Sequence, residues 1–567
     1  MITVKIYNAE DTEMYRFIPF IKYSANGCVC QSSKTDCEHY TMDLSVSEDG
    51  IKCVLHPKTE MKLMEFYVSA DKNLGVEEVF FANGFQSWTT CYEFHRNDTM
   101  NSVIPLSNIS KFTKHLTAMS GDGEFTEYRK GLFHSFTYTY FRKGADVELF
   151  GSLSERTGYT IFYLDVHKNS FKIQKDIEGL TVKEDYTLLD VVSFRGSYDE
   201  AFDGYFGSMN LRKPKTEGLS GDTSWYNYFQ KIDENIILRD LKGLDRAKDE
   251  TSIFQIDDGY ETFVGDWLVP DSKKFPNGMK PIADAIHGKG YLAGIWVAPF
   301  SVQRVSKTAK EHPEWLLKDE KGKPILGVFA WGGAYVLDMY NPEVREYIKK
   351  FFNVILREWG FDMVKLDFLY SEAMAPRNGK TRGQIMCEAM DFLRECVGED
   401  KLFLGCGVPL GPAFGVVDAC RISCDVDLKY KGKFYNALKV NPEIPSAQNA
   451  INNSIMRRHL NGRVFCNDPD VFFLRDFNLT FTDEQKLLLA KINNICGNIL
   501  FVSDNAGDFG EKEIELLKKF FKKTDAKITS AEYVTAEDIK IKFVENGSEK
   551  ELKFNIKTGA SNVEKIL

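Results

Sequence analysis

Residues 292–299 read Leu292-Ala293-Gly294-Ile295-Trp296-Val297-Ala298-Pro299, an apolar run of strand length that ends at a proline. Comparable apolar runs occur further along the chain, for example at residues 363–366 and 499–502. Longer segments with helical periodicity lie between several of these runs. One of them, 342–359, opens with Pro342 directly after Asn341, as helices often do. Strand-length runs that alternate with helices favour a parallel sheet.

The alternation continues from about residue 223 for roughly 290 residues, a length that suits a closed (β/α)8 TIM barrel of about 250 residues. An open, doubly wound parallel sheet is the structural alternative. The candidate strands are residues 224–229, 252–256, 292–297, 335–337, 363–366, 402–405, 419–423, 464–466 and 499–502, and a second candidate helix covers residues 484–495.

Alternating apolar and polar residues flank the predicted barrel on both sides. Residues 136–141 and 160–164 show this period of two, with turns rich in glycine and asparagine around them. The pattern predicts a β-sandwich before about residue 205. A polar connection at 212–218 marks the change of rhythm. Residues 539–543 and 551–556 alternate again and predict a small β-domain at the other end.

The chain has 567 residues, more than one hydrophobic core usually organises, so several domains are expected. We predict a multidomain architecture with a β-sandwich domain at residues 1–212, a catalytic (β/α)8 barrel at 213–510 and a small C-terminal β-domain at 511–567.

Charge and composition narrow the class of partner. The formal net charge is −10 and no lysine-rich block is present, which argues against nucleic acid and anionic membranes as partners. Neither a basic segment followed by an apolar stretch near Met1 nor an apolar run of about 18 residues is evident. We therefore expect a cytoplasmic protein that acts on a small neutral substrate.

Twelve cysteines are spread along the chain without a tight framework, which predicts reduced thiols. Cys28, Cys30, Cys37 and His39 form one cluster in sequence. Their spacing matches no common zinc-finger pattern, so a loop with free thiols is the preferred interpretation over a zinc site. We expect no metal and no cofactor.

Acidic residues follow several of the apolar strand candidates directly. Asp257 and Asp258 follow Ile256, Asp367 follows Leu366, and Asp425 lies just beyond residues 419–423. In a (β/α)8 barrel the carboxyl ends of the strands open onto one face, so these carboxylates would converge there. A single aspartate after a strand is more often a turn or helix-capping residue, but three such sites favour a functional cluster.

Two tryptophans strengthen the case for a sugar ligand. Trp225 and Trp296 lie in or near two predicted strand ends, where a flat ring can pack on the CH face of a sugar. Taken alone, each is more often a core residue. Carboxylates to accept sugar hydroxyls, together with aromatic rings, predict a carbohydrate site.

Four motifs then occur in a fixed order: Ile256-Asp257-Asp258-Gly259-Tyr260, Gly294-Ile295-Trp296-Val297-Ala298-Pro299, Lys365-Leu366-Asp367-Phe368, and Arg421 four residues before Asp425. In this order they resemble glycoside hydrolase family 36, the α-galactosidases and α-N-acetylgalactosaminidases. Residues 337–343 and 467–470 also look like family segments. The resemblance covers about residues 220–505 and implies an N-terminal β-supersandwich, a TIM barrel and a small C-terminal β-domain.

The resemblance also implies roles for individual residues of a retaining exo-α-galactosidase. Asp367 would be the nucleophile and Asp425 the acid/base, while Asp257, Asp258 and Lys365 would bind the outer hydroxyls of the sugar. Three further residues, Arg421, Cys406 and Gly407, fall where the family contacts the hydroxyl at carbon two, and Trp88 would be the aromatic that the first domain lends to the pocket. The loop 406–411 departs from the glycine-rich form common among larger members, which leaves recognition there open. Family members often form dimers or tetramers, so a homo-oligomer is expected.

The retaining mechanism sets physical requirements. Two carboxyl groups about 5–5.5 Å apart would pass through a covalent glycosyl-enzyme. Lys365 would keep Asp367 ionised, whereas Asp425 would need a partly desolvated setting or nearby negative charge to keep its proton. The segment Asp468-Pro469-Asp470 is interpreted as a structural turn that orients a barrel loop.

Three alternatives stay open. An α-N-acetylgalactosaminidase of the same family needs space at carbon two, and the small Gly407 permits it. A catalytically inactive carbohydrate-binding protein could share the scaffold, although both aspartates are present. A metal-dependent barrel hydrolase is a third class, but only nine histidines occur and no pair has an obvious ligand spacing.

Overall fold

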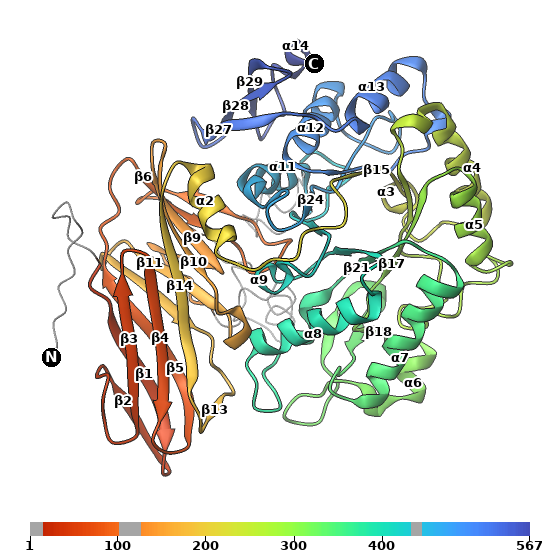
Figure 1. Ribbon diagram of the computed structural model, residues 1–567. Helices are drawn as coiled ribbons and strands as arrows, with labels where there is room; N and C mark the ends of the chain where they lie inside the picture. Colours follow the sequence, from red (N-terminus) through yellow and green to blue (C-terminus); the bar gives the residue numbers. More distant parts are fainter. Residues whose placement is uncertain (1–14, 101–125, 432–444) are drawn as a thin grey trace. The chain divides into compact units, whose positions relative to one another are not determined.

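The computed structural model describes residues 15–100, 126–431 and 445–567 (Figure 1). These residues form two compact units, which are described separately. The first unit comprises the described residues up to 211 together with 372–391 and 409–414, and the second comprises 212–371, 392–408 and the described residues from 415 onward. Among the described residues, no helix combines the length and the apolar character that crossing a membrane requires.

The first unit is built on two antiparallel sheets, as the period-two patterns predict. The first sheet has the order β2-β1-β5-β12-β11-β8, with β13 paired to β5, and the second has the order β3-β4-β14-β10-β9-β6-β7. Their buried faces share one core, in which Phe66 and Phe162 from the first sheet meet Leu55 and Leu189 from the second. The elements are β1 (Ile18–Ala25), β2 (Cys28–Ser32), β3 (Tyr40–Ser47), β4 (Gly50–Pro57), β5 (Met61–Asp71), β6 (Glu78–Ala82), β7 (Tyr92–Phe94), β8 (Leu132–Phe136), β9 (Tyr138–Lys143), β10 (Asp146–Ser152), β11 (Thr160–Asp165), β12 (Ser170–Lys175), β13 (Thr181–Val182), β14 (Tyr186–Gly196) and the helix α2 (Tyr198–Gly207).

The alternating run at 136–141 is not one strand. Thr137 adopts a left-handed backbone with φ of 70°, and the chain passes there from β8 in the first sheet to β9 in the second. A corner of this kind preserves the alternation of apolar and polar residues, so the sequence pattern alone does not reveal it.

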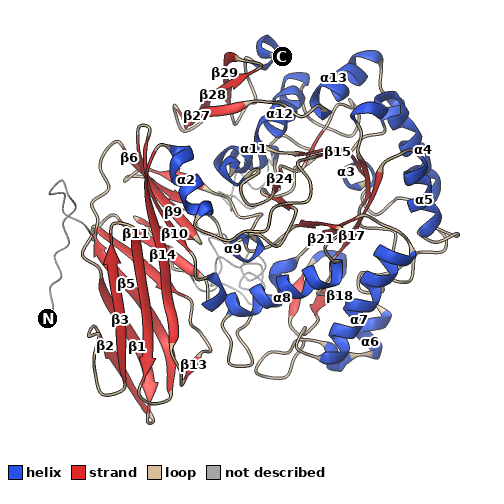
Figure 2. Ribbon diagram, in the orientation of Figure 1, coloured by secondary structure: helices blue, strands red, loops and turns tan. Residues whose placement is uncertain are grey.

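The second unit contains a curled parallel sheet that confirms the predicted barrel architecture (Figure 2). The strand order is β24-β23-β22-β21-β17-β16-β15-β26-β25, and every pair in it is parallel. Strand β24 also lies beside the residue that precedes β26, because the Asn498 N–H donates to the Asn467 carbonyl at 3.1 Å. The strands are β15 (Leu219–Thr223), β16 (Ile253–Ile256), β17 (Leu292–Val297), β21 (Met363–Leu366), β22 (Leu402–Gly405), β23 (Ala419–Arg421), β24 (Cys466–Asp468), β25 (Val471–Phe472) and β26 (Ile499–Val502).

The helices begin where their capping residues predict. Asn341 accepts a hydrogen bond from the Glu343 N–H at 2.9 Å and starts α7, and Thr482 with Gln485 forms a capping box at α12. Helix α7 ends at Asn353, and a short π-helical segment continues to Glu358. The longer helices outside the first unit are α4 (Glu234–Gly243), α5 (Lys280–Gly288), α7 (Pro342–Asn353), α11 (Ala447–Met456), α12 (Asp483–Cys496) and α13 (Glu511–Phe521), and α8 (Arg382–Val397) has residues in both units.

One predicted strand is wrong, and another lies in a different sheet. Residues 224–229 hold the short helix α3 (Trp225–Tyr228), because the strand before it already ends at Thr223. Residues 335–337 belong to β20 (Ala334–Val336), which pairs antiparallel with β18 (Ser301–Gln303) and β19 (Leu326–Val328) outside the barrel sheet. Both errors have one cause, since a run of four to six apolar residues does not distinguish a barrel strand from a helix turn or a small separate sheet.

Three antiparallel strands, β27 (Lys527–Tyr533), β28 (Asp538–Glu545) and β29 (Ser548–Asn555), form the predicted C-terminal sheet. This sheet belongs to the same compact unit as the barrel. Lys491 of α12 pairs with Glu545 of β28 at 2.7 Å, and the Tyr430 hydroxyl donates to the Ile556 carbonyl at 3.0 Å.

Candidate active site

Lys365 and Asp257 form a buried ion pair at the carboxyl ends of two neighbouring barrel strands. The Lys365 ammonium lies 2.8 Å from Asp257 Oδ2, and the two side chains are 8% and 4% exposed. Gln255 Nε2 donates to the same oxygen at 2.9 Å. Burial opposes ionisation of Asp257, but the Lys365 charge and hydrogen bonds outweigh it and hold the pKa of this carboxyl below its usual value.

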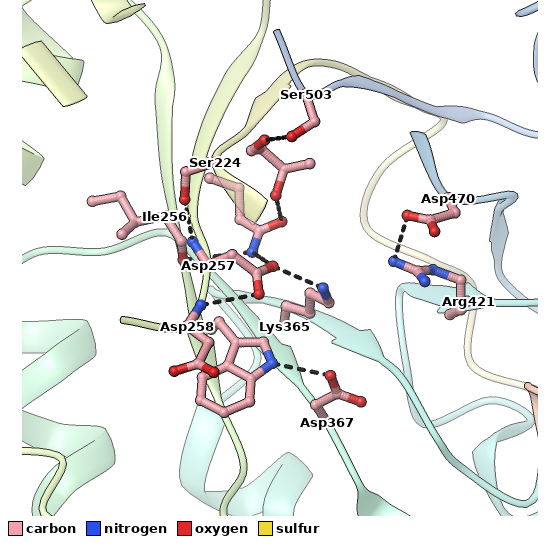
Figure 3. A network of polar contacts seen from close by, with 12 residues as sticks. Ser224, Ile256, Asp257, Asp258, Lys365, Asp367, Arg421, Asp470 and Ser503 are labelled. Carbon is pink, nitrogen blue, oxygen red and sulfur yellow. Dashed lines mark hydrogen bonds and ion pairs between the residues drawn. The ribbon is translucent and has the colours of Figure 1, made fainter. Parts of the chain in front are cut away.

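Backbone and side-chain hydrogen bonds lock this pair to strand β15 (Figure 3). The Ser224 hydroxyl accepts the Asp257 N–H at 3.0 Å, and Thr223 Oγ1 donates to Gln255 Oε1 at 2.9 Å. Ser503, which follows β26, donates its hydroxyl to the Thr223 carbonyl at 2.6 Å. Three adjacent strands thus determine where the Asp257 carboxylate points.

Asp258 lies beside this pair and collects hydrogen-bond donors. Trp331 Nε1 donates to Asp258 Oδ2 at 2.8 Å, and Gln230 Nε2 lies 3.0 and 3.1 Å from the two carboxylate oxygens. Burial raises the pKa of Asp258, while these donors and Glu261 act in the opposite direction. Glu261 is itself buried, and both burial and the Asp258 charge raise its pKa.

Asp367, directly after β21, is the most enclosed of the predicted catalytic residues. Trp296 Nε1 donates to its Oδ2 at 3.0 Å, and the Phe368 N–H donates to its Oδ1 at 2.9 Å. Phe368 has a φ of 55°, a strained backbone for a residue with a side chain. Burial raises the pKa of Asp367 and the Asp425 charge adds to this, against the effects of Lys365, Trp296 and the Cys406 thiol.

The contribution expected of Lys365, a positive charge that favours the ionised form of Asp367, acts in the predicted direction but is not the largest one. The Lys365 charge does lower the pKa of Asp367, but the loss of hydration on burial is the larger effect. The expected role of Trp296 changes. Its ring is 2% exposed and packs edge-on against Trp267 and Trp331. Trp296 therefore acts on Asp367 as a hydrogen-bond donor and offers little ring surface to a sugar.

Asp425 lies beyond the end of β23 and pairs with Arg421. Arg421 Nη1 lies 3.0 Å from Asp425 Oδ1, and the Asp425 side chain is 43% exposed. The expected desolvated setting for this residue is thus not what its own surroundings provide. Its charge nevertheless reaches Asp367, whose pKa it raises, so these two carboxyl groups lie within electrostatic range of each other.

Of the other predicted substrate contacts, Cys406 and Gly407 lie close to the residues around Asp367, whereas the two tryptophans Trp225 and Trp88 are half-buried elsewhere. Cys406 is buried and lends its thiol to Asp367, and Gly407, with a φ of 56°, accepts the Tyr370 N–H through its carbonyl at 2.8 Å. Trp225 is half-buried in α3 and packs edge-on against Phe229 at 5.2 Å. Trp88 is half-buried and belongs to the first unit, so its contribution to the pocket stays a prediction.

The family comparison becomes informative with this geometry in view. Residues 238–389 match the family model described as Melibiase. An α-galactosidase of Lactobacillus acidophilus is 31% identical over 180 residues, which cover 29% of this chain and 24% of the relative. The barrel is thus similar in sequence to the melibiase family over these residues. The aligned region thus spans about a quarter of the length of that curated relative.

Solved structures agree with the melibiase fold over most of the chain. An α-galactosidase from Thermus thermophilus, solved with p-nitrophenyl α-D-galactopyranoside, matches with a TM-score of 0.71 and 23% identity, covering 89% of this chain and 98% of its own. The family 36 α-galactosidase AgaA from Geobacillus stearothermophilus matches with a TM-score of 0.62 and 12% identity, covering 94% and 81%. The resemblance to family 36 is thereby confirmed.

Several polar residues of the site were not anticipated. They are Ser224, Tyr226, Gln230, Gln255, Glu261, Trp331 and Asp470. Glu261 follows the Asp257-Asp258-Gly259-Tyr260 segment directly, so its position offered a signal. Trp331, with a φ of 59°, and Gln230 come from loops whose distance from Asp258 in sequence conceals the contact.

The segment that contains Cys28, Cys30, Cys37 and His39 lies far from these aspartates in sequence and makes local contacts. The Tyr23 hydroxyl lies 3.7 Å from Cys37 Sγ and 3.1 Å from His39 Nδ1. Among residues 15–100, 126–431 and 445–567, no group of three or more His, Cys, Asp or Glu side chains is arranged to hold a metal ion.

Proposed function

We propose that this protein is a retaining exo-α-galactosidase that releases terminal α-linked galactose from oligosaccharides or glycosides. The observation that carries the proposal is the pair Asp367 and Asp425 at the carboxyl ends of β21 and β23, with the Lys365–Asp257 ion pair and Asp258 alongside. The names of the similar proteins support galactose as the sugar.

In the proposed reaction, an Asp367 oxygen attacks the anomeric carbon while Asp425 transfers a proton to the departing glycosidic oxygen. The bond to the leaving group breaks as the bond to Asp367 forms, which gives a β-linked glycosyl-enzyme. Asp425, now ionised, then accepts a proton from water as that water attacks the same carbon and releases Asp367. Two inversions retain the configuration of the sugar.

The contacts of Asp367 suit this role. The Trp296 and Phe368 N–H groups each donate to one oxygen, which orients the carboxylate and stabilises its charge. The buried ion pair of Lys365 with Asp257, and the donor-rich Asp258, present fixed charges to the sugar hydroxyls. A neutral sugar fits such a site better than a charged one, because the ion pair balances its own charge.

The test is hydrolysis of two matched aryl glycosides, p-nitrophenyl α-galactoside and p-nitrophenyl α-N-acetylgalactosaminide, by the full-length chain. We expect turnover of the galactoside and little turnover of the acetamido sugar. The opposite preference would point to the α-N-acetylgalactosaminidase alternative and to Gly407. Binding of galactose with no turnover of either substrate would instead identify a carbohydrate-binding protein.

We also propose that the protein is cytoplasmic and that it forms a homo-oligomer. Size-exclusion chromatography with light scattering tests the second.

A further inference from the structure

Three carboxyl groups surround the single guanidinium of Arg421, and Figure 3 shows one of them, that of Asp470. Arg421 Nη1 lies 3.0 Å from Asp425 Oδ1, Nε lies 3.3 Å from Asp468 Oδ2, and Nη2 lies 2.9 Å from Asp470 Oδ1. Arg421, Asp468 and Asp470 are all buried. One positive charge cannot balance three carboxylates, so the cluster favours retention of a proton.

Asp470 is the member of this cluster that contacts the backbone next to Asp425. Its Oδ2 accepts the Val426 N–H at 2.8 Å and also accepts the Tyr226 hydroxyl. The same carboxyl pairs with Arg421, the partner of Asp425. Asp470 thus holds the Asp425 segment from two sides. Its own backbone has a φ of 76°, and Asp468 Oδ1 accepts its N–H at 2.9 Å.

The charged and titratable groups that face Asp470 come from three places. Arg421 lies on β23, with Cys424 and Asp425 beyond it. Asp468 lies on β24, and Tyr226 lies on α3. Burial raises the pKa of Asp470 to about 7, with Arg421 opposing this and Asp425 and Asp468 adding to it. Tyr226 stays a neutral donor because burial raises its pKa well above the usual value.

We propose that Asp470 is a positioning residue for the acid/base Asp425: it fixes the Asp425 segment through the Val426 N–H and through Arg421, the cation that pairs with both carboxyl groups. This inference rests on the proposed function. Asp425 is half-exposed, and Asp470 gives it a nearby buried carboxyl group that keeps a proton available at neutral pH. Asp470 touches no reacting atom in this scheme and acts through its neighbours.

The first experiment compares wild type with Asp470→Asn on two substrates across pH. Removal of one carboxyl lets the cluster lose its retained proton at lower pH, so the alkaline limb of kcat/KM should move down by about one pH unit. The loss at neutral pH should be about tenfold larger for melibiose, a poor leaving group, than for p-nitrophenyl α-galactoside, which needs little protonation.

Tyr226→Phe provides the second, milder variant, because it removes only the hydroxyl that favours ionised Asp470. Its alkaline limb should move up, opposite to that of Asp470→Asn, and this measurement decides the matter if Asp470→Asn fails to fold. A folded Asp470→Asn protein with a wild-type pH profile, or with an equal loss for both substrates at every pH, would overturn the inference. Absence of wild-type activity on both substrates would instead refute the proposed function itself.

Discussion

The ammonium group of Lys365 lies 2.8 Å from Asp257 Oδ2, so the cation of β21 pairs with the carboxylate that follows β16. This pair is buried, and Figure 3 shows it near Asp258 and Asp367. Its removal should therefore affect stability as well as activity.

Lys365→Met should lower stability at pH 7 by about 3 kcal/mol, since a buried carboxylate is left without its cation. In wild type the depressed pKa of Asp257 adds stability above the unfolded pKa of about 4, and this is lost as the pH falls. Without Lys365 burial would raise that pKa, so the mutant should lose stability as the pH rises. Melting temperatures of wild type and Lys365→Met at pH 7 and pH 4.5 check this, and the mutant's loss of stability should be smaller at pH 4.5.

The exposed pair of Lys349 and Glu395 offers the control. Lys349→Met should change stability by less than about 0.5 kcal/mol.

Trp296→Phe should move the acidic limb of kcat/KM to higher pH. The nucleophile must be ionised, and the Trp296 N–H favours the ionised form of Asp367 against burial. Without this donor the pKa of Asp367 rises further, so activity fails at a higher pH. Trp267→Phe is a matched control, because the Trp267 N–H has no hydrogen-bond partner within the described part of the chain. A limb that moves equally in both variants would contradict the assigned role of the Trp296 donor.

Asp367→Ala and Asp425→Ala should separate the two catalytic roles. Both should lose at least about a thousandfold in turnover of melibiose. Asp425→Ala should still be glycosylated by p-nitrophenyl α-galactoside, and azide should accelerate release of the sugar, because azide needs no general base. Asp367→Ala should form no glycosyl-enzyme in mass spectra of the intact protein. Similar behaviour of the two variants would contradict the roles while leaving the site in place.

Gly221→Ala should destabilise the barrel strongly. An added Cβ at Gly221 would lie 1.8 Å from the Ile253 carbonyl oxygen on the neighbouring strand, so β15 would have to move away from β16. We expect a drop in melting temperature of several degrees with loss of activity. Gly288, at the end of α5, has nothing within 4 Å of an added Cβ, and Gly288→Ala should be neutral or slightly stabilising. A Gly221→Ala protein as stable as this control would show that the two strands tolerate separation.

The periodic patterns predicted the barrel strands well where each is a short, fully buried run. Leu292–Val297, Met363–Leu366, Leu402–Gly405 and Ile499–Val502 begin and end where the sequence placed them, because strands that are buried on both faces read as short, nearly continuous apolar runs. Prediction failed at Thr223, where a buried strand passes directly into α3, and at Thr137, where a strand-like run turns a corner between two sheets.

The sequence by itself determined the residue types of the site and their places after strands, because parallel strands bring their carboxyl ends to one face and the motifs occur in family order. The tertiary structure alone decided the pairing: which carboxylate receives Lys365, which donor holds Asp367, and that Asp470 faces Arg421. These outcomes depend on distances of a few ångströms between residues far apart in the chain. Such distances decide whether burial or a neighbouring charge controls each proton, and no local pattern encodes them.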